Sequence, residues 1–332
     1  MMDKAAKTAA QAELLYNRLV KRHRHLKKWA RRTGTGAFRL YDRDIPEIPL
    51  ALDLYGGAVS LALYKRPYEK EEREEEIWLL AMKDAVSKAL NIPIDRIFLK
   101  ERRRMKDRQE TGIQYGKMSL QSFYLDVTEG DLSFRVNLSE YLDTGLFLDA
   151  RKKRALIRAE AAGKSILNLF AYTCSLSAAA AKGGALSVDS VDLSKTYLEW
   201  GKINFALNGL EENSGFNFIR SDVFQFLKHA DAKGLRWDII ILDPQSFSNS
   251  KKMNGALDIK RDHTGLIRRC LSLLSPEGTL WFSSNAKGFK LDGETFPGLI
   301  VKDISNELVD EDFRGKKTPR CYTFTRNLTQ NR

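Results

Sequence analysis

From about residue 141 to the C-terminus, short apolar segments alternate regularly with amphipathic ones, and this alternation constrains the fold more than any other feature of the chain. The apolar segments have the length and composition of strands, and the segments between them have helical periodicity. We expect strands at 166–170, 186–191, 216–219, 237–242 and 278–283. Strands that alternate with helices predict a parallel sheet covered by helices, in an α/β domain.

Positive charge is concentrated at the start of the chain. Residues 1–32 hold ten Lys or Arg and two acidic residues, which leaves +8 of the whole chain's +12. Leu15, Leu19, Leu26 and Trp29 recur at helical spacings among these cations and predict a basic amphipathic helix. A second basic cluster lies at 100–108. A solvated helix face or a membrane-surface helix would explain the first cluster alone, whereas two separated clusters favour a nucleic-acid backbone.

These observations divide the chain into three parts. We expect a basic amphipathic helix at 1–38, a small α+β RNA-binding domain at 39–140 and the α/β domain at 141–332. The hairpin of the α+β domain turns at 129–131. The candidate RNA-binding residues are cations of the two basic clusters: Arg22, Lys27, Lys28, Arg31, Arg32, Arg102, Arg103 and Arg104.

The three cysteines, Cys174, Cys270 and Cys321, are too few and too scattered for a disulfide framework or a zinc site. The histidines have no metal-like spacing either, so we expect no metal. The apolar stretches are far shorter than the roughly 18 residues that a spanning helix requires. We therefore expect a cytoplasmic protein that neither crosses a membrane nor is exported.

Acidic residues follow three successive strands of the expected sheet: Asp192, Asp222 and Asp243. Ligands of such sheets bind beyond the carboxyl ends of the strands. The first loop, 168–175, lacks the glycine pattern of a dinucleotide site, which disfavours NAD, whereas Asp192 suits the ribose hydroxyls of an adenosine ligand. Any one of these acids by itself is equally well explained as a helix cap. Together they indicate S-adenosylmethionine, whose ribose, adenine amine and sulfonium each suit a different acid.

An ordered set of motifs over nearly the whole chain resembles the family of bacterial large-subunit ribosomal RNA guanine-N7 methyltransferases, which in some bacteria form the C-terminal half of a bifunctional protein. The motifs lie at 26–32, 39–42, 141–149, 168–173, 194–200 and 247–253. The resemblance implies a Rossmann-like class I methyltransferase domain with a seven-stranded, mostly parallel sheet. It also implies methylation of a guanine N7 in 23S ribosomal RNA, by direct in-line transfer from S-adenosylmethionine, by a stand-alone enzyme.

The resemblance assigns roles to individual residues. Asp192 is similar to the family's ribose acid and Asp222 to its adenine-reading residue. Asp243 and Pro244 resemble the Asp-Pro-Pro motif at the methyl-transfer point. We expect Asp243 or its backbone to contact the base and Phe247 to offer a stacking face, so these three are the catalytic candidates. A turn-forming Asp243 and a core Phe247 are the structural alternatives. The cofactor-binding candidates are Asp149, Arg151, Asn168, Tyr172, Thr173, Asp192, Leu193, Asp222, Val223 and Asp243.

Cys174 and Gln245 depart from the Gly and Pro that the family has at these positions. They motivate one alternative, an RNA-binding ribosome-assembly protein with weakened or lost catalysis. A second alternative is a ribosomal RNA cytosine-C5 methyltransferase, which needs a cysteine nucleophile at the fourth or fifth strand end. The fourth strand end, at 243–246, and the fifth, at 283–285, contain no cysteine, and we expect Cys270 and Cys321 in the core. A methyltransferase of small molecules or proteins is a third alternative, which the basic segments disfavour.

Overall fold

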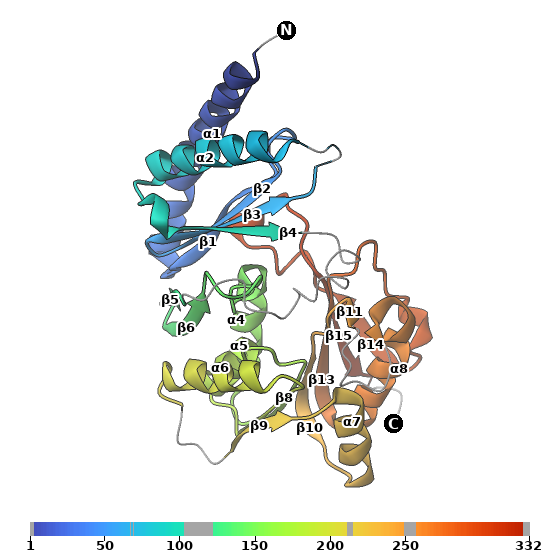
Figure 1. The fold of residues 1–332 in the computed structure, drawn as a ribbon. Helices are drawn as coiled ribbons and strands as arrows, with labels where there is room; N and C mark the ends of the chain where they lie inside the picture. Colours follow the sequence, from blue (N-terminus) through green and yellow to red (C-terminus); the bar gives the residue numbers. More distant parts are fainter. Residues whose placement is uncertain are drawn as a thin grey trace. The chain divides into compact units, whose positions relative to one another are not determined.

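The computed structural model describes residues 3–66, 68, 70–102, 122–210, 215–248 and 257–327. The contacts between residues divide the chain into two compact units, Met1–Leu148 and Asp149–Arg332, which we describe separately (Figure 1). The first unit includes both the basic helix and the strands of the expected α+β domain.

The first unit packs two helices against a four-stranded sheet with the strand order β1-β2-β3-β4. Strands β3 and β4 are parallel, and the other neighbours are antiparallel. Strands β5 and β6 pair as a separate hairpin. The elements are α1 (Lys4–Thr33), β1 (Ala37–Asp42), β2 (Leu50–Tyr55), β3 (Ala58–Tyr64), α2 (Glu72–Leu90), η1 (Ile94–Arg96), β4 (Ile97–Arg102), β5 (Tyr124–Glu129) and β6 (Leu132–Asn137).

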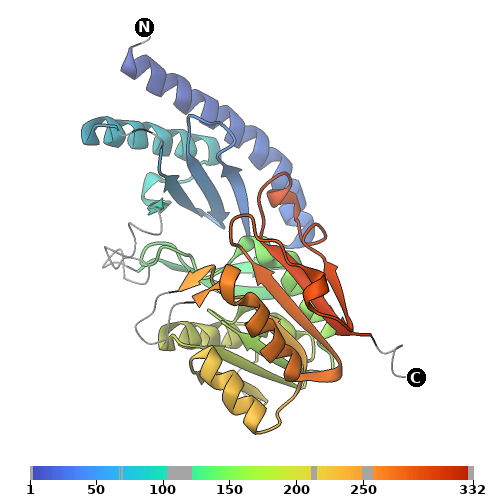
Figure 2. The same ribbon diagram turned by 90° about the vertical axis from the view of Figure 1, so that its right-hand side faces the viewer.

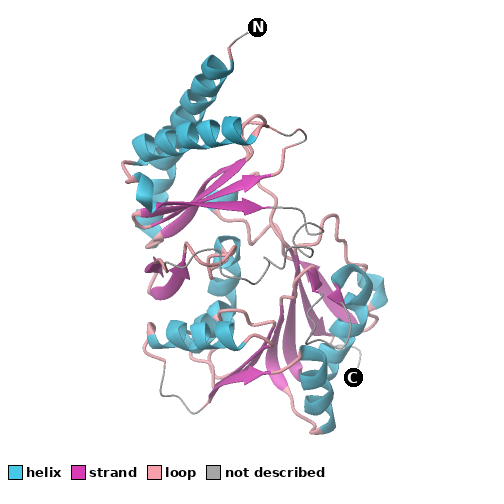
Figure 3. Ribbon diagram, in the orientation of Figure 1, coloured by secondary structure: helices cyan, strands magenta, loops and turns pink. Residues whose placement is uncertain are grey.

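The expected basic helix is present as α1, which runs beside α2 (Figure 3). Its apolar stripe is buried in the core of the first unit, where Leu15, Leu19 and Leu26 have no exposed surface. The helix ends at Gly34, whose φ of +64° and backbone N–H cap the last turn. Burial of the stripe leaves the cations of the other faces at the surface.

The second unit is built on a seven-stranded sheet with the order β14-β15-β13-β10-β7-β8-β9. Strands β13, β10, β7, β8 and β9 run parallel, and β15 is antiparallel to both of its neighbours. This confirms the predicted Rossmann-like, mostly parallel sheet. The strands are β7 (Ser165–Leu169), β8 (Ser187–Asp192), β9 (Phe216–Arg220), β10 (Trp237–Leu242), β13 (Leu274–Ser284), β14 (Leu299–Asp303) and β15 (Arg320–Arg326), beside a short pair, β11 (Phe247–Ser248) and β12 (Leu257–Asp258).

Helices cover both faces of this sheet (Figures 1 and 2). On one face lie α4 (Arg151–Glu160), α5 (Ser175–Lys182) and α6 (Lys195–Ala206), and on the other lie α7 (Val223–Ala232) and α8 (Ile259–Ser272). Short 3-10 turns complete the unit at η2 (Leu148–Ala150, which starts at the unit boundary), η3 (Gly293–Thr295) and η4 (Glu311–Phe313).

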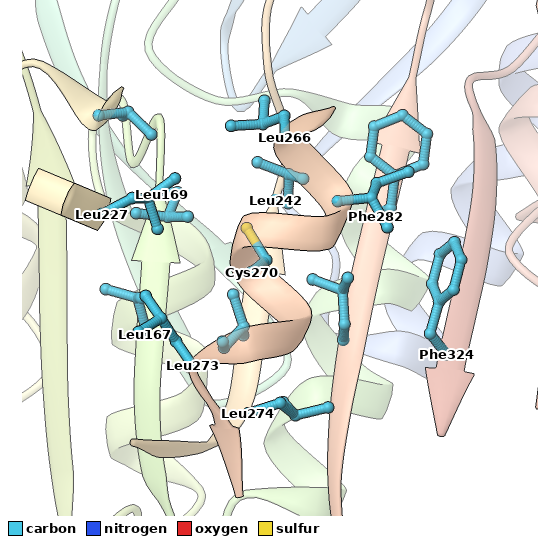
Figure 4. Close-up of a cluster of buried hydrophobic side chains, with 14 of the residues drawn as sticks. Leu167, Leu169, Leu227, Leu242, Leu266, Cys270, Leu273, Leu274, Phe282 and Phe324 are labelled. Atoms are coloured by element: carbon cyan, nitrogen blue, oxygen red, sulfur yellow. The ribbon is translucent and has the colours of Figure 1, made fainter. Parts of the chain in front are cut away.

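A large apolar cluster fills the space between the sheet and the helices α7 and α8 (Figure 4). Leu167, Leu242 and Phe282 contribute from three adjacent strands, and Cys270 contributes from α8. Cys270 has no exposed surface and Cys321 has 2%, which confirms that both belong to the core. A packed core of this kind fixes the position of each strand along its axis relative to the neighbouring strands.

The strand register brings the predicted loops to one edge. Leu242, the last residue of β10, pairs with Leu169 of β7 and with Phe282 of β13. Asp192 at the end of β8 pairs with Arg220 at the end of β9. The segments that begin at Phe170, Leu193, Ser221 and Asp243 therefore leave the sheet on the same side, where ligands of parallel sheets bind.

None of the helices in the described part of the chain combines the length and the apolar character needed to cross a membrane.

Candidate active site

The loop after β7 has an unusual backbone. Phe170, Tyr172 and Cys174 all have positive φ, at 56°, 53° and 58°, although none is glycine. Each such residue costs about 1–2 kcal/mol relative to the right-handed conformation. The loop is held by hydrogen bonds from Ala171 N to Val191 O (3.0 Å) and from Cys174 N to Ala171 O (2.8 Å). Strain of this kind concentrates where a ligand needs a particular backbone shape.

Asp192 ties this loop to the next one. Its Oδ2 accepts a hydrogen bond from Tyr172 N (2.9 Å), and its Oδ1 accepts one from Ser194 N (2.8 Å). Burial raises the pKa of Asp192, while the backbone N–H groups of Ser194, Tyr172 and Leu193 act in the opposite direction. A carboxylate has about four acceptor sites, so Asp192 retains capacity for hydroxyl groups of a ligand.

The next acid, Asp222, is the N-cap of α7. Its Oδ1 accepts a hydrogen bond from Gln225 N at 3.1 Å, so Asp222 does cap the helix, as the alternative explanation of this acid predicted. This cap uses one oxygen and leaves the other available. Asp222 and the partly buried Leu193 stand at the ends of β9 and β8, while Val223 is buried in the core beneath them.

Asp243, at the end of β10, forms an ion pair with a buried lysine. Lys153 Nζ of α4 lies 2.6 Å from Asp243 Oδ2 and donates a second hydrogen bond to Ser283 Oγ at 3.0 Å. The Lys153 side chain is 6% exposed and that of Asp243 is 32% exposed, so the lysine is covered and the carboxylate faces outward. The sequence analysis did not single out Lys153, because a lysine within the cationic run 151–154 is typical of a solvated helix face.

Arg151, another predicted cofactor residue, is engaged with acidic residues of the same unit. Its guanidinium donates to Asp310 Oδ2 (2.9 Å) and to both oxygens of Asp312 (3.0 and 3.3 Å). Asp312 is fully buried. This cluster connects α4 to the segment before β15, beside the partly buried Asp149. A contact of Arg151 or Asp149 with the cofactor stays a prediction.

Asn168 and Thr173 are buried at the base of the first loop. Asn168 Nδ2 donates to Ser177 Oγ at 2.8 Å, and Thr173 O accepts from Asn204 Nδ2 at 2.8 Å. Asn168 Oδ1 is buried and has no hydrogen-bond partner among the described residues. An acceptor of this kind suits a donor group of a ligand, because a buried polar atom without a partner costs about 1–3 kcal/mol.

The Cys174 side chain is buried, packs against Gly201 of α6 and lies with its Sγ 3.7 Å from Tyr172 O of its own loop. An added Cβ on Gly201 would lie 2.5 Å from Cys174 Sγ and 2.8 Å from its Cβ, so only glycine at position 201 leaves room for this thiol. Burial raises the pKa of the thiol well above its usual range. The extra side chain at position 174 is therefore accommodated beneath the loop, in a space that Gly201 leaves open.

The remaining catalytic candidates lie after β10. Pro244 is buried, Gln245 is exposed, and Phe247 is half-buried in β11, where it pairs with Asp258 of β12. Ser246 Oγ lies 3.4 Å from Asn285 Oδ1 in the segment after β13. The fourth and fifth strand ends thus approach each other next to Asp243.

The predicted RNA-binding residues that the structure describes lie on α1, apart from Arg102 at the end of β4. Lys27, Lys28, Arg31 and Arg32 are exposed on α1, and Arg22 is half-buried. The Arg102 side chain, Arg103 and Arg104 lie outside the described residues, as does most of the motif at 247–253. Within the described ranges, no group of three or more His, Cys, Asp and Glu side chains is placed to hold a metal ion.

The residues at this edge fit S-adenosylmethionine. Asp192 offers free acceptor sites to ribose hydroxyls, and Asp222 offers a second carboxylate. The unpartnered Asn168 Oδ1 suits a donor such as an amino group. Two carboxylates near a cofactor with a positively charged sulfur also favour its binding electrostatically.

Comparisons with known proteins agree with this interpretation. A model of the family described as S-adenosylmethionine-dependent methyltransferase matches residues 42–294. The chain is 47% identical over 306 residues to ribosomal RNA large subunit methyltransferase K of Neisseria meningitidis, covering 92% of this chain and 85% of that relative. It is 43% identical to ribosomal RNA large subunit methyltransferase K/L of Psychromonas ingrahamii, covering 97% of this chain and 42% of that relative. The chain thus spans less than half the length of the K/L relative.

Solved structures show the same architecture. The crystal structure of SMU.776 complexed with SAH superimposes with a TM-score of 0.73 at 26% identity, covering 94% of this chain and 81% of that one. The SAM-dependent methyltransferase of Agrobacterium tumefaciens shares the fold with a TM-score of 0.58 at 21% identity, covering 83% and 86%. These matches confirm the resemblance inferred from the sequence motifs, and the chain belongs to the S-adenosylmethionine-dependent methyltransferase family.

Proposed function

We propose that this protein methylates N7 of a guanine in large-subunit (23S) ribosomal RNA, with S-adenosylmethionine as the methyl donor. The observation that carries this proposal is the ion pair of Lys153 with Asp243 at the end of β10, in a chain whose relatives are named large-subunit ribosomal RNA methyltransferases. The same substrate favours the cytoplasm as the place of action.

The cofactor supplies, when bound, a methyl group on a positively charged sulfur that keeps the bonding electron pair as the methyl leaves. Asp192, Asp222 and Asn168 are the residues proposed to hold it, with Leu193, Val223, Tyr172 and Thr173 around them. Asp149 and Arg151 are proposed from the family resemblance.

Guanine N7 has an in-plane lone pair and no proton, so the protein needs no general base and no nucleophile of its own. Its task is to splay the guanine from its helix and hold N7 in line with the donated methyl group. The half-buried ring of Phe247 offers a stacking surface for the base, and the buried Pro244 shapes the turn beneath it.

Lys153 and Asp243 suit the charges of this reaction. A lysine ammonium has three N–H donors, and Lys153 uses two of them on Asp243 and Ser283. The third finds no acceptor within the described ranges, and guanine O6, beside N7, is an acceptor that this donor suits. Adenine carries an amino group there, which repels an ammonium. The Asp243 carboxylate favours the positive charge that methylation places on the purine.

Cytosine-C5 methylation is disfavoured by the state of the thiols. Cys174, Cys270 and Cys321 are all buried, and burial raises the pKa of each, that of Cys321 to about 11. A nucleophilic cysteine requires an accessible thiolate with a lowered pKa. None of these three side chains meets that requirement.

The non-catalytic alternative rests on Cys174 and Gln245. Cys174 is buried and packs against Gly201, so its thiol is accommodated within the fold, and Gln245 is exposed. These contacts favour a competent enzyme over an RNA-binding protein that has lost catalysis.

The test is methylation of large-subunit ribosomal RNA with labelled S-adenosylmethionine, followed by nuclease digestion and mass spectrometry of the nucleosides. We expect 7-methylguanosine, with rates strongly reduced in Asp243→Ala. A product of 5-methylcytidine, or cofactor-independent RNA binding without any methyl transfer, would contradict the proposal. Lys202→Ala serves as a control, because it breaks an exposed ion pair with Glu199 on α6 and leaves Lys153 and Asp243 unchanged.

A further inference from the structure

The first unit contains a cavity of about 520 Å³ that the methyl-transfer chemistry does not use. It lies between the C-terminal half of α1, the turn at Gly56 and Gly57 between β2 and β3, the end of α2, and Thr128 of β5. All of its lining residues belong to the same unit. Its volume falls within the range of about 300–1,000 Å³ that is typical of ligand pockets.

Part of the wall of this cavity is apolar. Ala30, Phe38, Leu54 and Ile92 are buried side chains that line it. Glycines at 34, 36, 56 and 57 line it as well, and they present backbone without side chains. Apolar surface beside bare backbone suits the face of a planar aromatic ring, such as a nucleobase.

Another part of the wall is cationic. His23, Lys27 and Arg31 line the cavity at intervals of four residues along α1, so they share one face of the helix. Lys27 and Arg31 are exposed, and neither side chain takes part in an ion pair within the described ranges. Other arginines of this unit differ, because Arg18, Arg39 and Arg43 are paired with Asp44, Asp53 and Asp42.

Burial and the charge of Lys27 lower the pKa of His23. Its imidazole is therefore mainly neutral at pH 7 and offers one donor, one acceptor and a ring face to a ligand.

From this combination we infer that the cavity binds one unstacked nucleotide of a single-stranded RNA segment. The base lies against the apolar and glycine walls, and its phosphate contacts Lys27 and Arg31. An apolar protein segment would not need two cations beside an apolar wall, whereas a nucleotide matches both. This inference rests on the proposed function in naming RNA, and it adds a second RNA contact apart from the base that is methylated.

A pair of matched double variants tests the charges. Lys27→Ala/Arg31→Ala removes the two cations of the cavity, and Lys21→Ala/Arg24→Ala removes two exposed cations of the same helix that do not line it. Affinity for a short single-stranded RNA is measured by fluorescence anisotropy over a range of salt concentrations. We expect the first variant to lose about tenfold or more in affinity and to flatten the salt slope by about 0.7 per lost phosphate contact. We expect the second to change both far less, and equal losses in the two variants would overturn the inference.

A shape variant tests the cavity without changing charge. An added Cβ on Gly57 would approach only Arg96 Nη1, at 3.8 Å, and Gly57 does not have positive φ, so Gly57→Leu is compatible with folding. We expect it to fill part of the cavity and weaken RNA binding with an unchanged salt slope. Gly265→Leu on α8, where an added Cβ meets nothing within 4 Å, is the matched control and should bind like the original protein.

Competition identifies the ligand chemistry. GMP should displace the labelled RNA from the original protein and not from Gly57→Leu, whereas inorganic phosphate at the same concentration should have little effect. Displacement by phosphate alone would reduce the cavity to an anion site and overturn the inference.

Methylation assays on the same proteins separate this inference from the proposed function. If the original protein methylates RNA and the cavity variants bind RNA normally, only the cavity inference fails. If no methyl transfer occurs while the variants lose RNA binding as expected, only the proposed function fails.

Discussion

Substitution of Gly201 by alanine gives a sharp test of how the chain accommodates Cys174. The new methyl group would lie 2.5 Å from Cys174 Sγ and 2.8 Å from its Cβ, which real side chains do not tolerate. Overpacking of a filled core costs about 1–3 kcal/mol. Alanine in a helix interior is about 1 kcal/mol more favourable than glycine. We therefore expect Gly201→Ala to destabilise the protein by up to about 2 kcal/mol.

The same reasoning predicts rescue. In a Cys174→Gly background the thiol is gone, and the nearest remaining atom to the added methyl is Cε1 of Phe218, at 3.4 Å. The steric term then largely disappears and the helix-propensity gain remains, so Gly201→Ala should stabilise that background by about 1 kcal/mol. The difference between the two backgrounds is a coupling energy of about 1–3 kcal/mol, the steric cost of the contact itself.

Urea unfolding followed by tryptophan fluorescence measures the four free energies, because Trp200 immediately precedes Gly201 and is buried. Cofactor binding, measured by calorimetry, should be retained in Cys174→Gly. If Gly201→Ala changes the stability by the same amount in the two backgrounds, the packing assigned to Cys174 is wrong.

Three further predictions concern the charged groups of the second unit. Because burial raises the pKa of Asp192, its protonated form appears at a higher pH than for an ordinary aspartate. Cofactor affinity, measured by calorimetric titration, should therefore fall as the pH is lowered from neutral towards 5. Asp192→Asn should bind the cofactor weakly at every pH. Arg151→Ala should lower the free energy of unfolding by about 3–5 kcal/mol, since it removes the guanidinium that pairs with the buried Asp312. Arg320→Ala, which breaks a half-exposed pair with Asp303, should lower it by about 1 kcal/mol or less in the same urea titration. Lys153→Met should slow guanine methylation about tenfold or more, because it removes a charge-assisted hydrogen bond, while the KM for the cofactor should change less. If the variant keeps the original rate, Lys153 has no part in the proposed mechanism.

Periodicity was sufficient to predict the five parallel strands of the second unit's sheet. Strands such as Trp237–Leu242 are buried on both faces, so their continuous apolar sequence identifies them, and helices between them leave only a parallel arrangement. The apolar stripe of α1 was predictable for the same reason. The candidate acids Asp192, Asp222 and Asp243 follow from the rule that ligands bind at the carboxyl ends of strands, which depends on chain order alone.

The partners of individual side chains were not predictable, because they depend on contacts between distant segments. Lys153 and Asp243 are 90 positions apart, and nothing in the cationic run 151–154 distinguishes the buried Lys153 from the surface Lys152. Arg151 and Asp312 are 161 positions apart. The space that Gly201 provides for Cys174 likewise arises only when α6 packs beside the loop after β7.

The three left-handed residues of that loop, Phe170, Tyr172 and Cys174, have a consequence for how a ligand is received. Since tertiary packing already imposes this backbone shape without a ligand, the free-energy penalty of ordering the loop is met when the chain folds. Binding of a ligand at this edge should therefore cost the polypeptide little conformational entropy, and it should not be slowed by a rearrangement of the loop.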